Sequence, residues 1–136
     1  MDFFKSLAIA ASGLRAQSGR MRVISENIAN AESTAQRTGG NPYRRKIPTF
    51  HSEMDRTLDA TVLTMGKTRL DPTDFRTKYE PGHPAADQNG YVKYPNVNSL
   101  VEMNDMREAQ RSYEANLNVI GSTRRMIQKT IDLLRA

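Results

Sequence analysis

The sequence predicts a mainly α fold, in which long N- and C-terminal helices pack as an antiparallel, coiled-coil-like hairpin joined by an extended, partly β middle insert. All six prolines lie between residues 42 and 95, and proline is excluded from helix interiors, so both ends are free to form long helices. Apolar residues at both ends recur in alternating steps of three and four, which is the spacing of a coiled-coil seam. Residues 32–97 hold five of the eight glycines, as expected for a turn-rich segment.

The first predicted helix covers residues 1–31. Gly13 and Gly19 lower its intrinsic helix propensity by about 1 kcal/mol each relative to alanine, but they allow a neighbouring helix to approach closely. Asn27, Asn30 and the Glu32–Thr34 run favour bonds from side chain to backbone and should end the helix near residue 31. The seam residues that we expect at a helix interface are Leu7, Leu14, Met21, Ile24 and Ile28.

The last predicted helix covers residues 98–136, and its regular part, residues 98–134, would be about 55 Å long. Asn98 or Ser99 can cap it, and Glu102 lies near the N3 position, as in a capping box. Acidic residues occur early and basic residues late, which suits the helix dipole. The seam residues that we expect at a helix interface are Met103, Met106, Tyr113, Leu117, Ile120, Ile127, Ile131 and Leu134.

The middle insert, residues 32–97, has short β-like pieces and no segment that could form a core alone. The predicted strands are Tyr43–Phe50, Ala60–Met65, Thr77–Tyr79 and Tyr91–Tyr94. The basic run Arg44-Arg45-Lys46 is typical of a solvated turn. We therefore expect residues 1–31 and 98–136 to form one discontinuous helical domain, interrupted by the insert.

The two seams do not account for all the apolar side chains of the helices. Phe4, Ile9, Val23, Val101 and Val119 lie off the seams and should remain partly exposed. Large exposed apolar surfaces mark sites of contact with partners. The sequence therefore favours assembly through the helices, with itself or with other proteins. The alternative is a plain two-helix hairpin packed on its own insert.

Composition excludes several classes of protein. A chain of 136 residues without cysteine has the length of one domain and has no disulfide framework, thiolate zinc site or cysteine nucleophile. No apolar run reaches the roughly 18 residues of a membrane span, and Leu7–Ala11 is too short for the core of a cleaved signal peptide. The net charge of +5 is spread along the chain rather than gathered in one basic tail.

The sequence shows no constellation of residues for catalysis. It has no phosphate-binding glycine loop, nucleophile elbow or paired-histidine zinc motif. We therefore expect no catalytic residues, no cofactor and no metal. Two alternatives stay open at this point: a basic nucleic-acid-binding protein, suggested by Arg44-Arg45-Lys46, and a hydrolase or metal enzyme built on His51 and His83.

Several segments resemble one family. Residues 11–14 (ASGL) and 27–32 (NIANAE) resemble the N-terminal signature of the bacterial flagellar rod and hook proteins. Residues 104–116 resemble the terminal helix of the same family. Residues 79–87 and 90–97, together with the short length of the chain, resemble the proximal-rod members specifically.

This resemblance implies a structural subunit of the proximal rod, the drive shaft that transmits motor torque across the periplasm. It implies helix–helix assembly around a central export channel, with further copies of the chain, the rod proteins FlgB, FlgF and FlgG, and FliE. It also implies passage through the flagellar type III export apparatus without a cleaved signal peptide, and a final place in the basal body. Contacts with nucleic acid and a direct membrane span are not expected.

Overall fold

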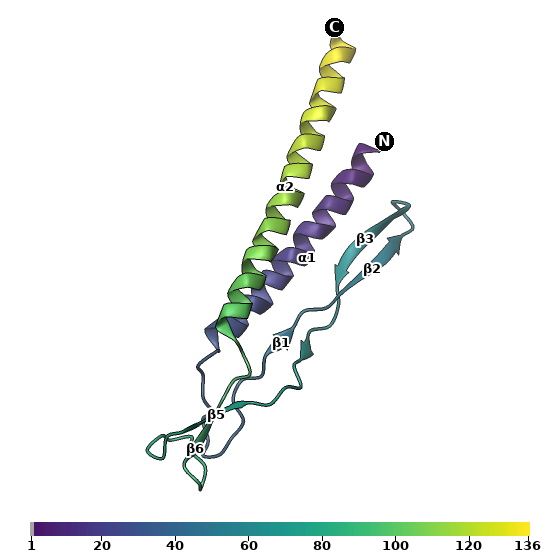
Figure 1. The fold of residues 1–136 in the computed structure, drawn as a ribbon. Helices are drawn as coiled ribbons and strands as arrows, with labels where there is room; N and C mark the ends of the chain where they lie inside the picture. Colours follow the sequence, from purple (N-terminus) through teal and green to yellow (C-terminus); the bar gives the residue numbers. More distant parts are fainter. Residues whose placement is uncertain (1) are drawn as a thin grey trace. The chain divides into compact units, whose positions relative to one another are not determined.

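The computed structural model describes residues 2–136 and contains a long helix near each end of the chain (Figure 1). Helix α1 runs Phe3–Ala29 and helix α2 runs Ser99–Arg135. Both predicted helices are confirmed, because their expected and observed ends differ by one or two residues. The β-containing middle is confirmed as well, as a set of short hairpins.

Within residues 2–136, six short strands pair into three two-stranded antiparallel sheets. The pairs are β1 (Lys46–Ile47) with β4 (Arg69–Leu70), β2 (Phe50–Asp55) with β3 (Ala60–Met65), and β5 (Arg76–Tyr79) with β6 (Tyr91–Tyr94). Strands β3 and β6 have the predicted bounds. The predicted strand Tyr43–Phe50 was too long, because only Lys46 and Ile47 pair within it, and Phe50 belongs to the next strand.

The chain divides into two compact units, and each long helix contributes to both. Unit 1 comprises residues 1–21, 49–67 and 107–136, of which residue 1 lies outside the described part. Unit 2 comprises residues 22–48 and 68–106.

In unit 1, the helices α1 and α2 are antiparallel neighbours. Gly13 lies against Asn116, because a Cβ atom added to Gly13 would lie 2.8 Å from the Asn116 Oδ1 atom. Seven residues later on α1, Arg20 lies 3.5 Å from Glu108, eight residues earlier on α2. The expectation that small residues admit a close helix is confirmed at Gly13, whereas Gly19 instead faces Met65 of β3.

The β2–β3 hairpin of unit 1 lies along α1. Lys5 Nζ donates to the Asp59 carbonyl at 3.1 Å, and the Leu63 N–H donates to the Ser12 hydroxyl at 3.1 Å. With the contact of Gly19 and Met65, three α1 residues spaced seven apart contact the hairpin in the order of its sequence. Strand β3 therefore runs parallel to α1 within this unit.

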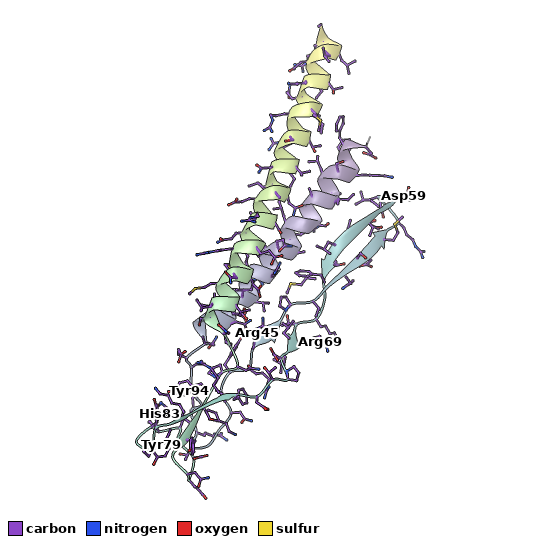
Figure 2. The ribbon with its side chains drawn as sticks, in the orientation of Figure 1. Arg45, Asp59, Arg69, Tyr79, His83 and Tyr94 are labelled. Atoms are coloured by element: carbon purple, nitrogen blue, oxygen red, sulfur yellow. The ribbon has the colours of Figure 1, made fainter. Side chains whose placement is uncertain are left out.

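The small core of unit 2 lies beside the β5–β6 hairpin. Val92 of β6 is fully buried and packs with Ala85 and Ala86, with Ala35 and Tyr94 at the edge. Gly90, at φ 83°, makes the turn into β6, a conformation that favours glycine. The Tyr79 and Tyr91 rings meet edge-on, with their centres 5.3 Å apart, and both side chains remain exposed. Tyr79 is labelled in Figure 2.

Side chains at the first residues cap both helices. The Asp2 carboxylate accepts from the Phe4 N–H at 2.9 Å, and the Asn98 side chain accepts from the Leu100 N–H at 3.1 Å. Of the two predicted caps of α2, Asn98 is therefore the one used. Near the end of α1, the Asn30 amide donates back to the Glu26 carbonyl at 2.8 Å, which agrees with the predicted end of the helix.

Candidate assembly surface and the polar cluster of unit 2

The predicted seam of α1 lies mostly at intermediate depth. Leu7, Leu14, Met21 and Ile28 are half-buried, and Ile24 is 2% exposed. Small and polar side chains are buried between these positions, among them Ser12, Gly13 and Ala16. Helix α1 therefore buries two adjoining faces in unit 1, because it contacts both α2 and the hairpin.

The predicted seam of α2 is divided between covered and exposed positions. Met106, Tyr113, Ile120 and Ile127 are half-buried. Met103, Leu117, Ile131 and Leu134 are exposed, Leu117 by 51% and Leu134 by 83%. Half of the predicted interface residues on α2 therefore face outward in the single chain, and their role in assembly stays a prediction.

In unit 1, the covered face of α2 does not coincide with the predicted seam. It retains Tyr113, Ile120 and Ile127, but Asn116 is covered in place of Leu117, and Thr123, between Ile120 and Ile127, is buried as well. Because Asn116 lies directly against Gly13, the close contact of the helices uses a small and a polar residue. A search for apolar periodicity passes over such positions.

Four of the five apolar residues placed off the seams are exposed, as predicted. Phe4 is 77% exposed, and Ile9, Val101 and Val119 are each close to half exposed. The prediction for Val23 was wrong, because that side chain is 6% exposed and belongs to the interior of unit 2.

Beneath the outer surface of unit 2, the Glu102 carboxylate is buried and bonded to two segments distant in the sequence. It accepts hydrogen bonds from Arg45 Nε and, at 3.2 Å, from Asn27 Nδ2. Its side chain is 1% exposed. The capping-box assignment of Glu102 was therefore wrong, because both carboxylate oxygens face these partners instead of the first turn of α2.

The Asn27 side chain uses all its hydrogen-bonding capacity at this point. Its amide donates to the Lys46 carbonyl at 2.8 Å as well as to Glu102. Its carbonyl oxygen accepts from the Lys46 N–H at 3.0 Å and from the Tyr43 hydroxyl at 2.8 Å. Burial is the main cause of the raised pKa of the Tyr43 phenol. The polar cluster around Glu102, Arg45, Asn27 and Tyr43 thus ties strand β1 to both helices within unit 2.

The interpretation of Arg44-Arg45-Lys46 as a solvated turn was wrong. The Arg44 guanidinium lies 4.2 Å from the centre of the Phe75 ring and donates to the Asp71 carbonyl at 2.8 Å. Lys46 Nζ bonds Glu26 at 2.8 Å, and this bond raises the pKa of Lys46. All three cations are half-buried and have partners within unit 2, so the run is not a free patch for a nucleic acid.

The guanidinium of Arg45, a residue labelled in Figure 2, pairs with three carboxylates. Besides Glu102, its guanidinium lies 3.3 Å from Asp71 and 3.8 Å from Asp105. Burial opposes the charge of Arg45, but the hydrogen bonds and charges of Glu102 and Asp71 outweigh it and raise the pKa of Arg45. The Thr73 N–H, which donates to Asp71 at 2.9 Å, is the main cause of the lowered pKa of Asp71, and Arg45 adds to it.

The two histidines occupy different hairpins. His51 is exposed on β2 in unit 1, and His83 lies in the turn between β5 and β6 in unit 2, where its Nδ1 accepts from the Ala85 N–H at 3.0 Å. Within residues 2–136, no group of three or more histidine or acidic side chains is placed to hold a metal ion. Over the same residues, neither helix combines the length and the hydrophobicity of a membrane span.

Comparison with known proteins identifies the family. Residues 7–35 match the family model described as flagella basal body rod protein, and residues 88–133 match the one described as flagellar basal body rod FlgEFG protein C-terminal. The chain is 56% identical to the flagellar basal-body rod protein FlgC of Agrobacterium fabrum, over 94% of this chain and 92% of the relative.

Less similar relatives belong to the same family. The chain is 36% identical to FlgC of Aquifex aeolicus over 97% of both chains, and 39% identical to FlgC of Salmonella typhimurium over 92% of both. These similarities span both helices and the hairpins between them. The chain therefore belongs to the FlgC family of flagellar basal-body rod proteins, a structural and non-enzymatic part of the flagellar basal body.

Proposed function

We propose that this chain builds the proximal rod, the drive shaft that carries motor torque across the periplasm, by helix–helix contacts around the export channel. Its neighbours in this proposal are further copies of itself, the rod proteins FlgB, FlgF and FlgG, and FliE. It reaches the rod through the flagellar type III export apparatus. The helices of residues 1–31 and 98–136 act as the rod-building domain, and residues 32–97 as its insert.

One observation carries this proposal: the long helices leave large apolar side chains outside. On the last part of α2, Leu117, Ile131, Leu133 and Leu134 are all at least 39% exposed. From Gln128 to the end of the chain, every residue is exposed. Exposed apolar surface of this kind is stabilised when another protein covers it, and a shaft of packed helices would cover it all round.

A matched pair of substitutions tests the proposal. Leu117→Glu places a charge at an exposed apolar position, and Asn118→Glu places the same charge at the next, exposed polar position. Both positions are exposed in the single chain, so both variants should fold with nearly unchanged stability. We expect Leu117→Glu to abolish swimming and rod formation in cells that lack the natural gene, and Asn118→Glu to retain both.

The same strains separate assembly from export. Secretion of both variants into the medium, measured by immunoblotting, shows that each is exported. Cryo-electron microscopy of basal bodies from the Asn118→Glu strain should place the chain in the proximal segment of the rod. Normal rods in the Leu117→Glu strain, or density for the chain at another place, would overturn the proposal.

A further inference from the structure

A second row of exposed side chains follows α2 in unit 1, beside its covered face. Val119, Met126 and Leu133 are spaced seven apart and are 48%, 43% and 78% exposed. Seven residues are close to two helical turns, so the three side chains lie along one side of the helix. Each precedes a residue of the predicted seam, as Val119 precedes Ile120. We call Val119, Met126 and Leu133 the outer stripe.

Positive charge borders the outer stripe. Arg125 and Lys129 are exposed, and a turn of about 100° per residue places them beside Met126 and Leu133. Among the described residues, neither side chain lies within ion-pair distance of an acidic group. Residues 115–136 as a whole contain four basic residues and one acidic residue. The outer stripe is therefore an apolar surface with an unneutralised basic border.

The outer edge of the β2–β3 hairpin in the same unit also carries exposed apolar side chains, but its charge is negative. Strand β3 faces α1, because its Leu63 N–H bonds Ser12, so β2 is the outer strand. Phe50 and Met54 lie on one face of β2 and are 37% and 52% exposed. Glu53 lies on the other face, is exposed, and forms no ion pair within residues 2–136. Because β2 is an outer strand, the side chains on its two faces lie on either side of any partner that packs along its free edge.

We propose that the free edge of β2 in one copy packs against the outer stripe of α2 in a second copy. Phe50 and Met54 then contact the apolar side chains, while Glu53, on the opposite face of the strand, reaches the basic border. This contact rests on the proposed function, since it is one of the contacts between copies in the rod.

The spacing of the two surfaces agrees. Four strand residues from Phe50 to Met54 cover about 13 Å, and seven helical residues from Val119 to Met126 cover about 10.5 Å. The negative strand and the positive border favour a second copy as the occupant, because each copy carries one surface of each kind. A contact between two different surfaces of the same chain repeats in one direction and generates a ring or a helical array.

Cysteine cross-linking tests this contact directly, since the natural chain contains no cysteine. One chain carries Met54→Cys and another carries Met126→Cys. The control is Gln128→Cys, because Gln128 is exposed, lies outside the predicted seam, and comes two residues after Met126, which places it on the opposite side of the helix. The two chains are expressed together in cells that lack the natural gene, and basal bodies are oxidised mildly and run on a non-reducing gel.

We expect a disulfide-linked dimer from Met54→Cys with Met126→Cys, several-fold less from Met54→Cys with Gln128→Cys, and none from either chain alone. If the cells swim and no dimer forms, or if both pairs cross-link equally, the contact is wrong although the chain builds the rod. If no rod contains the chain at all, the proposed function itself fails.

A charge exchange provides a second, independent measurement. Glu53→Lys and Lys129→Glu should each reduce swimming, because each brings like charges together across the contact. The double variant restores the attraction and should swim better than either single variant. Equal or additive losses in the double variant would overturn the pairing of these two side chains.

Discussion

Arg45 and Glu102, separated by 57 residues in the sequence, form a hydrogen-bonded ion pair in the interior of unit 2. Glu102 is almost completely buried, whereas the Arg45 side chain retains 21% exposure. Because a carboxylate loses much of its hydration at such a position, Glu102 depends on the Arg45 guanidinium for a compensating charge.

We predict that Arg45→Ala lowers the free energy of unfolding by about 3–5 kcal/mol, the usual cost of leaving a buried charge without its partner. Lys5→Ala is the control, because it removes an exposed ion pair with Asp59, which typically contributes under about 1 kcal/mol. Urea unfolding followed by circular dichroism measures both. Equal losses in the two variants would show that the Glu102 carboxylate finds water or another partner.

Stability should fall in acid through Asp71. The pKa of this carboxyl is lower in the folded chain than its ordinary value of 3.8. Between the lowered pKa and pH 3.8, the unfolded chain binds more protons than the folded chain. Asp71 therefore stabilises the fold above pH 3.8, and this contribution is lost as the pH falls through the lowered pKa. Unfolding measured between pH 7 and pH 2 should show a shallower acid slope for Asp71→Asn than for the natural chain. An unchanged slope would assign the acid sensitivity to other carboxyls.

The hairpin of unit 1 should depend on the Ser12 hydroxyl. This buried group accepts the Leu63 N–H and donates to the Ile9 carbonyl at 2.7 Å. Ser12→Ala leaves the Leu63 N–H without its acceptor, at a typical cost of about 1–3 kcal/mol. Hydrogen exchange at the Leu63 amide should become faster. Ser18→Ala, at an exposed position of the same helix, should leave this rate unchanged.

Two helix glycines should respond oppositely to alanine. At Gly121 the nearest atom to an added Cβ is 3.6 Å away, so Gly121→Ala should raise stability by about 0.5–1 kcal/mol through helix propensity. At Gly13 the added Cβ would meet Asn116, so Gly13→Ala should show no such gain and reduce stability. Thermal unfolding compares the variants. In an Asn116→Ala background, Gly13→Ala should recover the gain, and failure to do so would place the conflict elsewhere.

Truncation to alanine should cost more stability at Ile120, on the covered face of α2, than at the exposed polar residue Gln128. Ile120→Ala removes part of a half-buried side chain, at a cost near the lower end of the usual range of about 2–5 kcal/mol, and should abolish rod formation. Gln128→Ala removes only an exposed hydrogen bond to Asp132 and should stay within about 0.5 kcal/mol of neutral. A swimming assay with a secretion control compares them. Normal swimming of the Ile120→Ala strain would contradict the assignment of this face.

The long helices were predictable because their apolar spacing and the absence of proline are properties of the local sequence. The close approach of a helix at Gly13 was expected as well, but the contacts of α1 with the hairpin were not, because Ser12 and Gly19 are small or polar and carry no apolar signal. Lys5, Ser12 and Gly19 are spaced seven apart, and so are Gly13 and Arg20. This spacing is a signal only when a search for periodicity includes small and polar residues.

The wrong prediction for Glu102 and the missed strand β2 have one cause, because both depend on partners distant in the sequence. Glu102 has a capping-box offset from the start of α2, and nothing in its neighbourhood indicates Arg45 as its partner. Strand β2 was missed because its sequence, Phe-His-Ser-Glu-Met-Asp, lacks β-branched residues and is strongly exposed. It becomes a strand by pairing with β3, whose Thr61, Val62 and Thr64 carry the propensity for both.

The parallel course of α1 and β3 in unit 1 also limits how this chain can change in evolution. From Lys5 to Gly19 the helix rises about 21 Å, and the segment from Asp59, the last residue of the turn, to Met65, the last residue of β3, extends about 20 Å. Fourteen helical residues therefore match six residues of this segment. A single residue gained or lost inside β3 would turn every later side chain of the strand to the opposite face. Insertions and deletions that accumulate among descendants of this gene should therefore fall in the turn Arg56–Leu58, where length is free to vary, and spare the strand beside the helix.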